Sequence, residues 1–371
     1  MKKVKVGLVG VGYISGIYLE NLHGMFADLI DVVAYSDLIQ ERADEAAAKW
    51  GGVACKSNEE LFAMDEVEIV LNLTTPDAHA LINLQALEAG KCAYVEKPHS
   101  ITREDGVKIV ELAKKKGLLV GGAPDTWMGG GIQTCIKMID DGWIGTPVAA
   151  TAFMTCHGHE SWHPDPAFYY KVGGGPMFDM GPYYLTALIS MLGPIASVAG
   201  STRITSPQRT ITSQPRYGTK IDVEVPTHVA GLINFQSGAV GSVITSFDVW
   251  AAQLPRIEIY GTRGSLSVPD PNTFGGPVRL FRAGSEEWED VPVPFGYIGN
   301  SRGLGLADMA VALRTGRKPR NDGTQTYHVL DAMHAFHDAS DTGTVYKLAS
   351  TCERPAPLPL GLRDGQIEAD E

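Results

Sequence analysis

A lysine at the end of an apolar stretch is the residue of this sequence best placed to do chemistry. The segment from Cys92 to Ser100 reads Cys-Ala-Tyr-Val-Glu-Lys-Pro-His-Ser, so an apolar strand runs into the pair Glu96-Lys97, which Pro98 follows. Proline favours extended geometry in the residue before it, so Lys97 is predicted to leave the strand at a set angle. In an open parallel sheet, ligands bind beyond the carboxyl ends of the strands. We therefore expect Lys97 in a ligand site, although a surface lysine before a turn would have the same local sequence.

A second candidate group lies in the run Gly-Gly-Gly-Pro-Met-Phe-Asp-Met-Gly-Pro-Tyr-Tyr, which starts at residue 173. Its glycines let a ligand approach the backbone closely, and a helix is predicted from here to Leu192. Asp179 falls near the helix start, where it either orients a bound ligand or caps the helix. Tyr183 follows four residues later and carries a phenol, which transfers protons when a nearby cation lowers its pKa.

The loop 156–166 brings three histidines and two acids together in the sequence Cys-His-Gly-His-Glu-Ser-Trp-His-Pro-Asp-Pro. His163 is the third candidate for proton transfer. His157 and His159 would point to one side of a strand, as metal ligands can, but no fourth ligand accompanies them and we predict no metal site. The aromatic residues Trp162, Phe168, Tyr169 and Tyr170 would stack on a ligand ring or pack in the core.

The elements that must position these side chains begin with a regular alternation of strands and helices. Strands are predicted at 4–9, 31–35, 68–73, 92–95 and 118–121, and helices at 40–50, 77–89 and 103–116, with a further helix ending at Leu22. This order predicts an α/β fold over residues 1–124, a doubly wound parallel sheet of the Rossmann type.

The first strand ends in a glycine-rich turn, Gly10-Val11-Gly12-Tyr13-Ile14-Ser15-Gly16. Gly10 and Gly12 fit a tight turn at a helix N-terminus, where backbone amides and the helix dipole favour a pyrophosphate. Tyr13 and Ile14 belong to the same predicted contact. The third position of the dinucleotide fingerprint is Ser15 rather than glycine, so the motif alone is weak evidence.

The second strand closes with Ser36-Asp37, and an acidic residue there accepts hydrogen bonds from a cofactor ribose. Apolar Leu38 follows without an adjacent arginine, which favours NAD over NADP. Asp37 is also a good cap for the helix that begins at Gln40, and the two roles are compatible.

The third strand runs into Thr74-Thr75-Pro76-Asp77, with His79 in the first helical turn beyond it. We expect Thr74, Thr75 and Pro76 to border the cofactor together with Glu96 and Lys97. His79 either joins them or is a structural histidine.

In this order and spacing, the sequence resembles the glucose-fructose oxidoreductase / inositol dehydrogenase (Gfo/Idh/MocA) family nearly end to end. The most specific parts are Glu-Lys-Pro at a strand end and the glycine-rich run before Asp179. The resemblance implies an NAD(P)-dependent sugar oxidoreductase in which Lys97 is catalytic. It also implies a C-terminal α+β domain whose open sheet forms an oligomer interface. The family has a histidine four residues after this aspartate, where this chain has Tyr183.

Beyond residue 124 the regular alternation stops. Strands at 148–156, 198–205, 228–235, 239–249 and 257–260 and helices at 132–141, 304–313 and 327–348 predict an α+β domain on a mostly antiparallel sheet, residues 125–371. One face of this sheet is expected to meet helices and the other a second subunit, giving a homo-oligomer (dimer, tetramer or higher). The Pro-rich, acidic end from Glu353 is predicted to be an arm or a frayed tail.

Oxidation of an alcohol requires a group that takes the hydroxyl proton while hydride leaves the carbon. Lys97 is such a base if burial and another cation lower its pKa, and Tyr183 is one if the charge of Lys97 lowers the pKa of the phenol. His163 is the remaining option. We favour Lys97 acting with Tyr183, with Asp179 orienting a sugar hydroxyl.

The pairing of His163-Pro-Asp-Pro with the run from residue 173 resembles a bacterial branch of the family that oxidises the C3 hydroxyl of glycosides. This resemblance implies a 3-keto product, and we expect tightly bound NAD. Two alternatives stay open: an NADPH-dependent reductase of a keto-sugar, and a sensor that binds sugar and NAD without turnover.

The composition agrees with a small-molecule substrate. The 371 residues include 31 Lys and Arg against 43 Asp and Glu, a net charge of −12, and no basic run, which argues against nucleic acid and membrane partners. The five cysteines lack zinc-type spacing, and no apolar run is long enough to span a membrane. We expect a cytoplasmic protein whose partner is a small sugar or glycoside.

Overall fold

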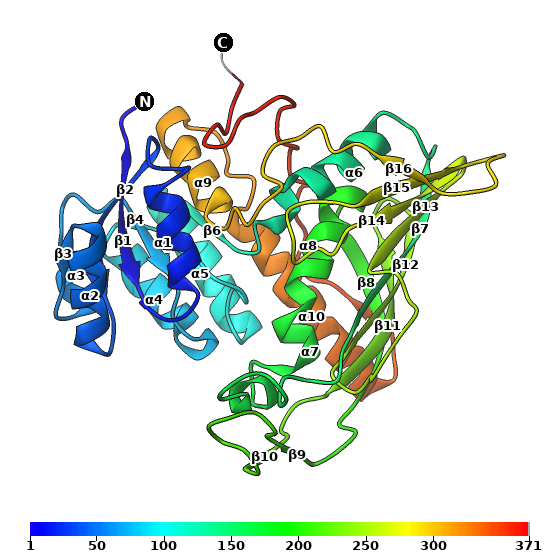
Figure 1. Cartoon of the computed structure of the whole chain (residues 1–371), viewed down its shortest axis with the longest axis horizontal. Coiled ribbons are helices and arrows are strands. Elements are labelled where there is room, and N and C mark those ends of the chain that lie inside the picture. The colour runs from blue at the N-terminus through cyan, green and yellow to red at the C-terminus, as the bar shows by residue number, and fades with distance from the viewer. Residues whose placement is uncertain (370–371) are drawn as a thin grey trace.

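The first 122 residues of the computed structural model, which describes residues 1–369, form a six-stranded parallel sheet in the order β3-β2-β1-β4-β5-β6 (Figure 1). Its strands are β1 (Val4–Val9), β2 (Ile30–Ser36), β3 (Val53–Ala54), β4 (Ile69–Asn72), β5 (Cys92–Val95) and β6 (Val120–Gly122). The helices are α1 (Ser15–His23), α2 (Gln40–Trp50), α3 (Asn58–Phe62), α4 (Pro76–Glu88) and α5 (Arg103–Lys116). The predicted doubly wound sheet is confirmed.

Local sequence explains these elements. β4 and β5 are buried along their whole length, as expected of apolar strands covered by helices on both sides. α5 begins where the Thr102 side chain accepts a hydrogen bond from the amide of Asp105, and it ends at Gly117, which adopts the left-handed conformation. These connections place the ends of β1, β2, β4 and β5 at one edge of the sheet.

The second large sheet has nine strands in the order β16-β15-β14-β13-β7-β12-β11-β8-β17, of which β7 and β12 pair in parallel and the other neighbours antiparallel. The strands are β7 (Pro147–Thr155), β8 (Ile195–Arg203), β11 (His228–Phe235), β12 (Val240–Ser246), β13 (Ile257–Gly261), β14 (Gly264–Val268), β15 (Val278–Arg282), β16 (Glu289–Val291) and β17 (Tyr346–Lys347). A separate hairpin joins β9 (Gln208–Thr210) to β10 (Lys220–Asp222). The predicted mostly antiparallel sheet is confirmed, although β14–β16 were not predicted.

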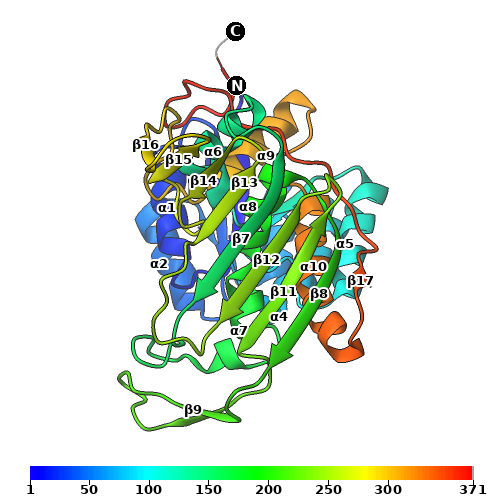
Figure 2. The same cartoon turned by 90° about the vertical axis from the view of Figure 1, so that its right-hand side faces the viewer.

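Helices lie between the two sheets (Figure 1), and the other face of the large sheet is turned to the viewer in Figure 2. They are α6 (Gly130–Asp140), α7 (Gly175–Asp179), α8 (Gly181–Leu192), α9 (Leu304–Thr315) and α10 (Gly323–Thr342), with short turns η1 (Thr126–Met128) and η2 (Ala167–Tyr170). α8 is buried over its whole length. On the other face of the sheet Leu232 is 49% exposed. The predicted homo-oligomer stays a prediction.

Two predictions about the end of the chain are wrong. The last helix ends at Thr342 because Gly343 adopts a left-handed conformation, and Tyr346–Lys347 then pairs with β8. The segment after Glu353 is not a frayed arm, since it buries three apolar side chains and the Arg354 guanidinium binds the Asp140 carboxylate at 2.6 Å. The buried side chains are Leu358, Leu362 and Ile367.

The chain from Ser301 to Asp331 also packs on the first sheet. Asp322 forms a β-bridge with Gly121, and the Gly122 amide donates to the Asn321 carbonyl at 3.2 Å. The two predicted domains therefore share a junction, and their division at residue 124 stays a prediction. In residues 1–369, no helix is both long enough and apolar enough to cross a membrane.

Candidate functional site

The glycine-rich turn after β1 has the shape that a pyrophosphate requires. Gly10 has φ +94°, and a Cβ there would lie 2.8 Å from the backbone of Leu73 and Thr74, so only glycine fits. A Cβ on Gly12 would meet nothing within 4 Å, so the fold itself does not require glycine at this position. A ligand that approaches the backbone closely would require it. Ser15 completes the turn, with its Oγ donating to the Gly12 carbonyl at 2.6 Å. The turn opens α1, and these features fit the phosphates of a dinucleotide.

Asp37 joins this turn to the end of β2. Its Oδ2 accepts a hydrogen bond from the Val11 amide at 2.7 Å and its Oδ1 one from the Ile39 amide at 2.8 Å. Ile39 rather than Asp37 is the residue that caps α2. The sequence has no arginine next to Asp37, but in space Arg42, in the first turn of α2, brings Nη1 to 3.9 Å from Oδ1.

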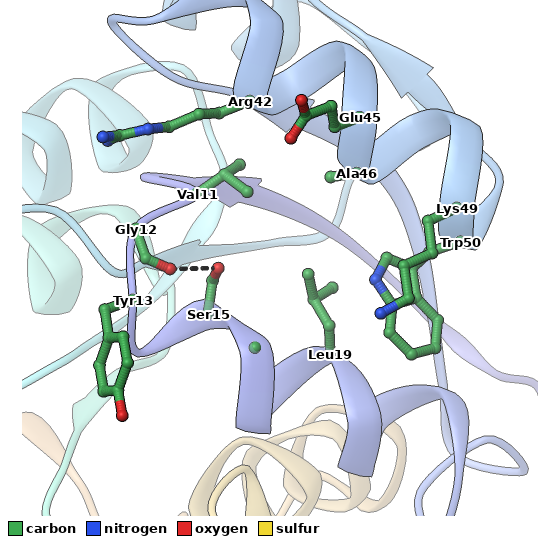
Figure 3. Close-up of a pocket in the computed structure, with 11 residues that line it drawn as sticks. Val11, Gly12, Tyr13, Ser15, Leu19, Arg42, Glu45, Ala46, Lys49 and Trp50 are labelled. Carbon is green, nitrogen blue, oxygen red and sulfur yellow. Dashed lines mark hydrogen bonds between the residues drawn. The ribbon is translucent and has the colours of Figure 1, made fainter.

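A cavity of about 410 Å³ opens next to the glycine turn, between α1 and α2 (Figure 3). The Arg42 side chain extends across Val11 at one end, and Lys49 and Trp50 close the other. Tyr13 lies at the rim and is fully exposed. Lys97 is not part of its lining, so this cavity belongs to the cofactor end of the site rather than to the reacting end.

The loop after β4 is held by buried polar groups. Asn72 Oδ1 accepts from Thr74 Oγ1 at 2.6 Å. The ring of His79 lies between two carbonyl oxygens, with Nδ1 2.7 Å from Pro98 O and Nε2 3.1 Å from Thr74 O. Burial lowers the pKa of His79. His79 thus ties this loop to the Lys97-Pro98 turn, and cofactor contacts of Thr74, Thr75, Pro76 and His79 stay predictions.

Glu96 anchors the turn that carries Lys97. Its Oε1 accepts from the Tyr18 hydroxyl at 2.7 Å and its Oε2 from the Lys97 amide at 2.9 Å. Tyr18 belongs to α1, so the helix behind the glycine turn and the strand that presents Lys97 are linked directly. The Lys97-Pro98 peptide is cis.

Lys97 and Asp179 meet between the two parts of the chain. Lys97 Nζ donates to Oδ1 and to the main-chain oxygen of Asp179, both at 2.8 Å. The side chains are 19% and 12% exposed. Burial is the largest single influence on Lys97 and lowers its pKa, but the combined effects of Asp179, Tyr183 and Glu96 raise it by more, so the net shift is upward. Burial, the largest single influence, raises the pKa of Asp179, but Lys97 and His159 together outweigh it and bring the value to about 2. Both groups are therefore charged at neutral pH.

Tyr183 lies on the other side of Lys97, whose Nζ is 5.4 Å from the centre of the phenol ring. Burial raises the pKa of Tyr183, and the opposing effects of Lys97 and Arg302 do not reverse the shift. The two conditions set for Lys97 and Tyr183 as bases, a lowered pKa in each case, are thus not met. Arg302 is a residue that the sequence did not reveal, because the segment Asn-Ser-Arg-Gly around it carries no motif.

Two of the three histidines of the loop after β7, His159 and His163, have different surroundings. His163 Nδ1 accepts from the Asp165 amide at 3.1 Å, within its own loop, and burial lowers the pKa of His163. From the sequence alone, His159 is considered only as a possible metal ligand. In the structure its Nε2 lies 3.4 Å from Asp179 Oδ2. The sequence offers no spacing signal for this contact, since 20 residues and η2 separate the two.

The loop that carries these histidines rests on a buried ion network. Arg209, from the β9–β10 hairpin, reaches Glu160 at 3.2 Å and also binds the Asp248 carboxylate. The Glu160 carbonyl accepts from the amides of Thr212 and Ser213, both at 2.9 Å. The hairpin therefore fixes the backbone on the C-terminal side of His159.

Aromatic rings line the same loop. Tyr169 stacks on the His159 ring with centroids 3.8 Å apart, and Phe168 lies 4.0 Å from Tyr169. Trp162 is 62% exposed and Tyr170 is buried, so the four predicted aromatic residues divide between a surface and a core position. Within residues 1–369, no group of three or more His, Cys, Asp or Glu side chains is arranged to hold a metal ion.

Two family models match this chain. Residues 4–122 match the oxidoreductase family with an NAD-binding Rossmann fold, and residues 132–267 match the GFO/IDH/MocA C-terminal domain. The N-terminal part is thus an NAD-binding Rossmann domain.

Individual relatives agree with these matches. The inositol 2-dehydrogenase/D-chiro-inositol 3-dehydrogenase of Lactiplantibacillus plantarum is 33% identical over 148 residues, which are 39% of this chain and 42% of that protein. A dTDP-3,4-didehydro-2,6-dideoxy-alpha-D-glucose 3-reductase of Streptomyces antibioticus is 26% identical over 312 residues, 82% of this chain and 85% of that protein. The solved structure of levoglucosan dehydrogenase in complex with NADH and levoglucosan has a TM-score of 0.79 at 21% identity, covering 94% of this chain and 99% of the other. At that identity the likeness is one of fold.

Proposed function

Because this chain belongs to the Gfo/Idh/MocA family of oxidoreductases, we propose that it oxidises a secondary hydroxyl of a sugar or glycoside, at C3 of the pyranose ring, with NAD as the acceptor. The observation that carries the proposal is the Lys97–Asp179 ion pair beyond the end of β5, at the sheet edge that also bears the glycine turn. The names of the relatives, which act on inositols, a dTDP-sugar and levoglucosan, support the substrate class.

Lys97 is assigned the task of binding the reacting hydroxyl. An ammonium has three N–H donors, and the described residues accept two of them, both through Asp179. The third is available to the hydroxyl oxygen, where a fixed cation stabilises the negative charge that develops as the C–H bond breaks. When bound, NAD accepts the hydride.

Asp179 and Tyr183 are assigned supporting tasks. Asp179 orients Lys97 and keeps it charged, and its remaining lone pairs are available to a sugar hydroxyl. Tyr183 stays neutral at physiological pH, because its pKa is raised, and therefore offers an O–H donor to the substrate.

The choice of C3 rests on chemistry and on the named relative that reduces at C3. A ketone at C3 acidifies the hydrogen on C2 and allows a later loss of the C1 substituent. The exposed ring of Trp162, within the histidine loop, supplies a surface on which a flat aglycone can stack.

The test is NADH formation with a panel of inositols, free sugars and glycosides, followed by NMR of the products. We expect turnover with pyranosides and a ketone at C3. A ketone at C2 or C4, a lactone from C1, or activity on inositols alone would contradict the C3 assignment. Absence of turnover with the whole panel, together with NAD binding, would favour the sensor.

One observation favours a second candidate, an NADPH-dependent reductase of a keto-sugar. Arg42 lies beside Asp37 and is half exposed, so it is within reach of a 2′-phosphate. The test is the reduction of a 3-keto sugar. A kcat/KM with NADPH that is higher than with NADH would support this candidate and reject NAD as the catalytic cofactor.

Contacts from α1 to Glu96 and from α7 to Lys97 hold the turn after β5 in place, and we also expect that NAD stays bound through purification. Acid release of the nucleotide from the purified protein, followed by chromatography, should give near one NAD per chain. A protein that is purified free of nucleotide would remove this part of the proposal.

A further inference from the structure

The carboxylate of Asp179 lies next to two other side chains. Its Oδ1 faces Lys97, and its Oδ2 lies 3.4 Å from Nε2 of His159. A lysine, a carboxylate and an imidazole thus form a continuous row at the point where β5, α7 and the loop after β7 meet.

The imidazole of His159 is held in place by its surroundings. Tyr169 stacks on one face at 3.8 Å and 25°, and Phe247 presents its edge at 4.7 Å and 70°. The side chain is 10% exposed, and Nδ1 is buried without a hydrogen-bond partner among the described residues. A buried polar atom left without a partner is costly, so its retention calls for a reason beyond packing.

The separation of 3.4 Å between Nε2 and Asp179 Oδ2 is long for a charge-assisted hydrogen bond, which is usually 2.7–2.9 Å. Nε2 of the neutral ring is therefore not committed to Asp179 and can accept a proton from a third group. Once protonated, the ring gains the carboxylate as a partner. The other two candidates lack this property, because Lys97 already holds its proton and the phenol of Tyr183 is a weak acceptor.

We propose that His159 is the proton acceptor of the reaction, a role that rests on the proposed sugar oxidation. As the C–H electron pair of the carbinol leaves as hydride to NAD⁺, the O–H bond breaks and its electron pair forms the carbonyl π bond. The proton moves to Nε2 of His159, giving an imidazolium beside Asp179, which later releases the proton to solvent. NAD⁺ and a neutral ring become NADH and a charged ring, so charge and electrons balance.

Several charged and titratable groups surround the His159 ring. Asp179 at the end of α7 and Lys97 at the end of β5 face the site with opposite charges, Tyr169 of η2 covers one face, and His163 and Glu160 belong to its own loop. A pH profile is therefore informative only as a difference between variants.

The experiment compares His159→Gln and His159→Ala with the wild type, using the complete chain with NAD and a substrate from the panel. We expect kcat to fall at least about a hundredfold in both, with KM and the Kd for NAD changed less than threefold. The wild type should lose kcat at acid pH, and His159→Gln should lack this limb. Added imidazole should restore part of the turnover of His159→Ala.

The matched control is His228→Gln, which alters a half-buried histidine of β11 that pairs with Ser246; its kcat should stay within twofold of wild type. Wild-type kcat in either His159 variant, or an unchanged acid limb in His159→Gln, would overturn the role of His159. If the variants do not fold, the wild type alone provides the test: a kcat that does not change with pH at acid pH would equally overturn the role of His159.

Product analysis separates the two proposals. A ketone at a carbon other than C3 contradicts the proposed position of oxidation while the loss in His159→Gln still supports the histidine. A 3-keto product formed equally well by His159→Gln contradicts the histidine alone. A wild type that oxidises no sugar contradicts both.

Discussion

The cofactor end and the reacting end of this site are built in different ways. Around the glycine turn, the contacts are hydrogen bonds from backbone amides to one carboxylate within the β1–α1–β2 unit and the residues just after it, such as those from Val11 and Ile39 to Asp37. At the reacting end, the side chains come from three separate segments, and Lys97 and His159 each meet Asp179 only because the chain is folded. The first end is built around one strand–helix–strand unit, and the second is assembled from three separate segments.

This difference has an energetic consequence. A turn stabilised by backbone amides loses about 1 kcal/mol when one hydrogen bond is removed. Buried charges that hold each other lose more, because removing one leaves its partner desolvated and unpaired. We therefore expect mutations and pH to act more strongly on the reacting end than on the cofactor end.

The largest effect is expected for Lys97→Ala. Without the cation, the developing charge on the substrate oxygen is unsupported and Asp179 is left buried and unpaired, so turnover should fall about 10³- to 10⁴-fold. The Kd for NAD should change less than threefold, as measured by fluorescence titration. Lys108→Ala removes an exposed lysine of α5 and serves as the control. Equal losses in turnover and NAD affinity would show that the two ends are not separable.

The next effect concerns the support of the histidine loop. Arg209→Met keeps the length of the side chain but leaves Glu160 and Asp248 without their cation, so we expect the free energy of unfolding to fall by about 3–5 kcal/mol. Urea unfolding measures it. Arg216→Ala, on the same hairpin, breaks an exposed pair with Asp165 and should cost less than about 1 kcal/mol. Equal costs would mean that the buried network does not support the loop.

A third prediction uses pH. Asp125 is buried and accepts the amides of Gly303 and Gly305 at 2.9 and 3.1 Å, beside the loop that carries Arg302. Burial raises the pKa of Asp125 from 3.8 to about 6. Since the folded state holds this proton more tightly than the unfolded state, the contribution is full below about pH 3.8 and is lost as the pH rises through about 6.

Asp125→Asn keeps an acceptor for the two amides but cannot ionise. Relative to wild type, the variant should therefore gain up to about 3 kcal/mol of unfolding free energy between pH 4 and pH 7. Denaturant unfolding at the two pH values measures this difference. A constant difference would show that Asp125 does not titrate in the folded state within this range.

The same contrast explains what could be predicted from the sequence. The parallel sheet, the glycine turn and Asp37 follow from local patterns, because the sheet repeats one strand–helix alternation and the turn and Asp37 each stand at the end of a single strand. Lys97 and Asp179 were singled out separately by their neighbours in sequence. Their contact, and the raised pKa of Lys97 that follows from it, depends on how two distant segments pack.

His159 marks the limit of sequence reasoning most clearly. Its spacing to His157 suggested a metal ligand, whereas its partner is Asp179, 20 residues along the chain. Arg42 gave the converse error at the cofactor end, because an arginine in the first turn of α2 is adjacent to Asp37 in space and not in sequence. The final segment was also wrongly predicted, because its composition is proline-rich and acidic although three of its apolar side chains are buried. These are Leu358, Leu362 and Ile367.

The smallest predicted effect lies at the cofactor end, where one charge is expected to make the protein bind NAD more tightly than NADP. The carboxylate of Asp37 would face a 2′-phosphate, so the Kd for NADP should exceed that for NAD by at least about tenfold, roughly 1.4 kcal/mol. Asp37→Asn retains an acceptor for the Val11 and Ile39 amides and removes the charge, so it should make the Kd values for NAD and NADP more alike.

Arg42→Ala should increase the difference between the two Kd values, because it removes the cation beside Asp37. Isothermal titration with both dinucleotides measures all three proteins. Equal constants in the wild type would take Asp37 out of this role, and a gap that does not change in Arg42→Ala would show that the arginine does not reach the phosphate.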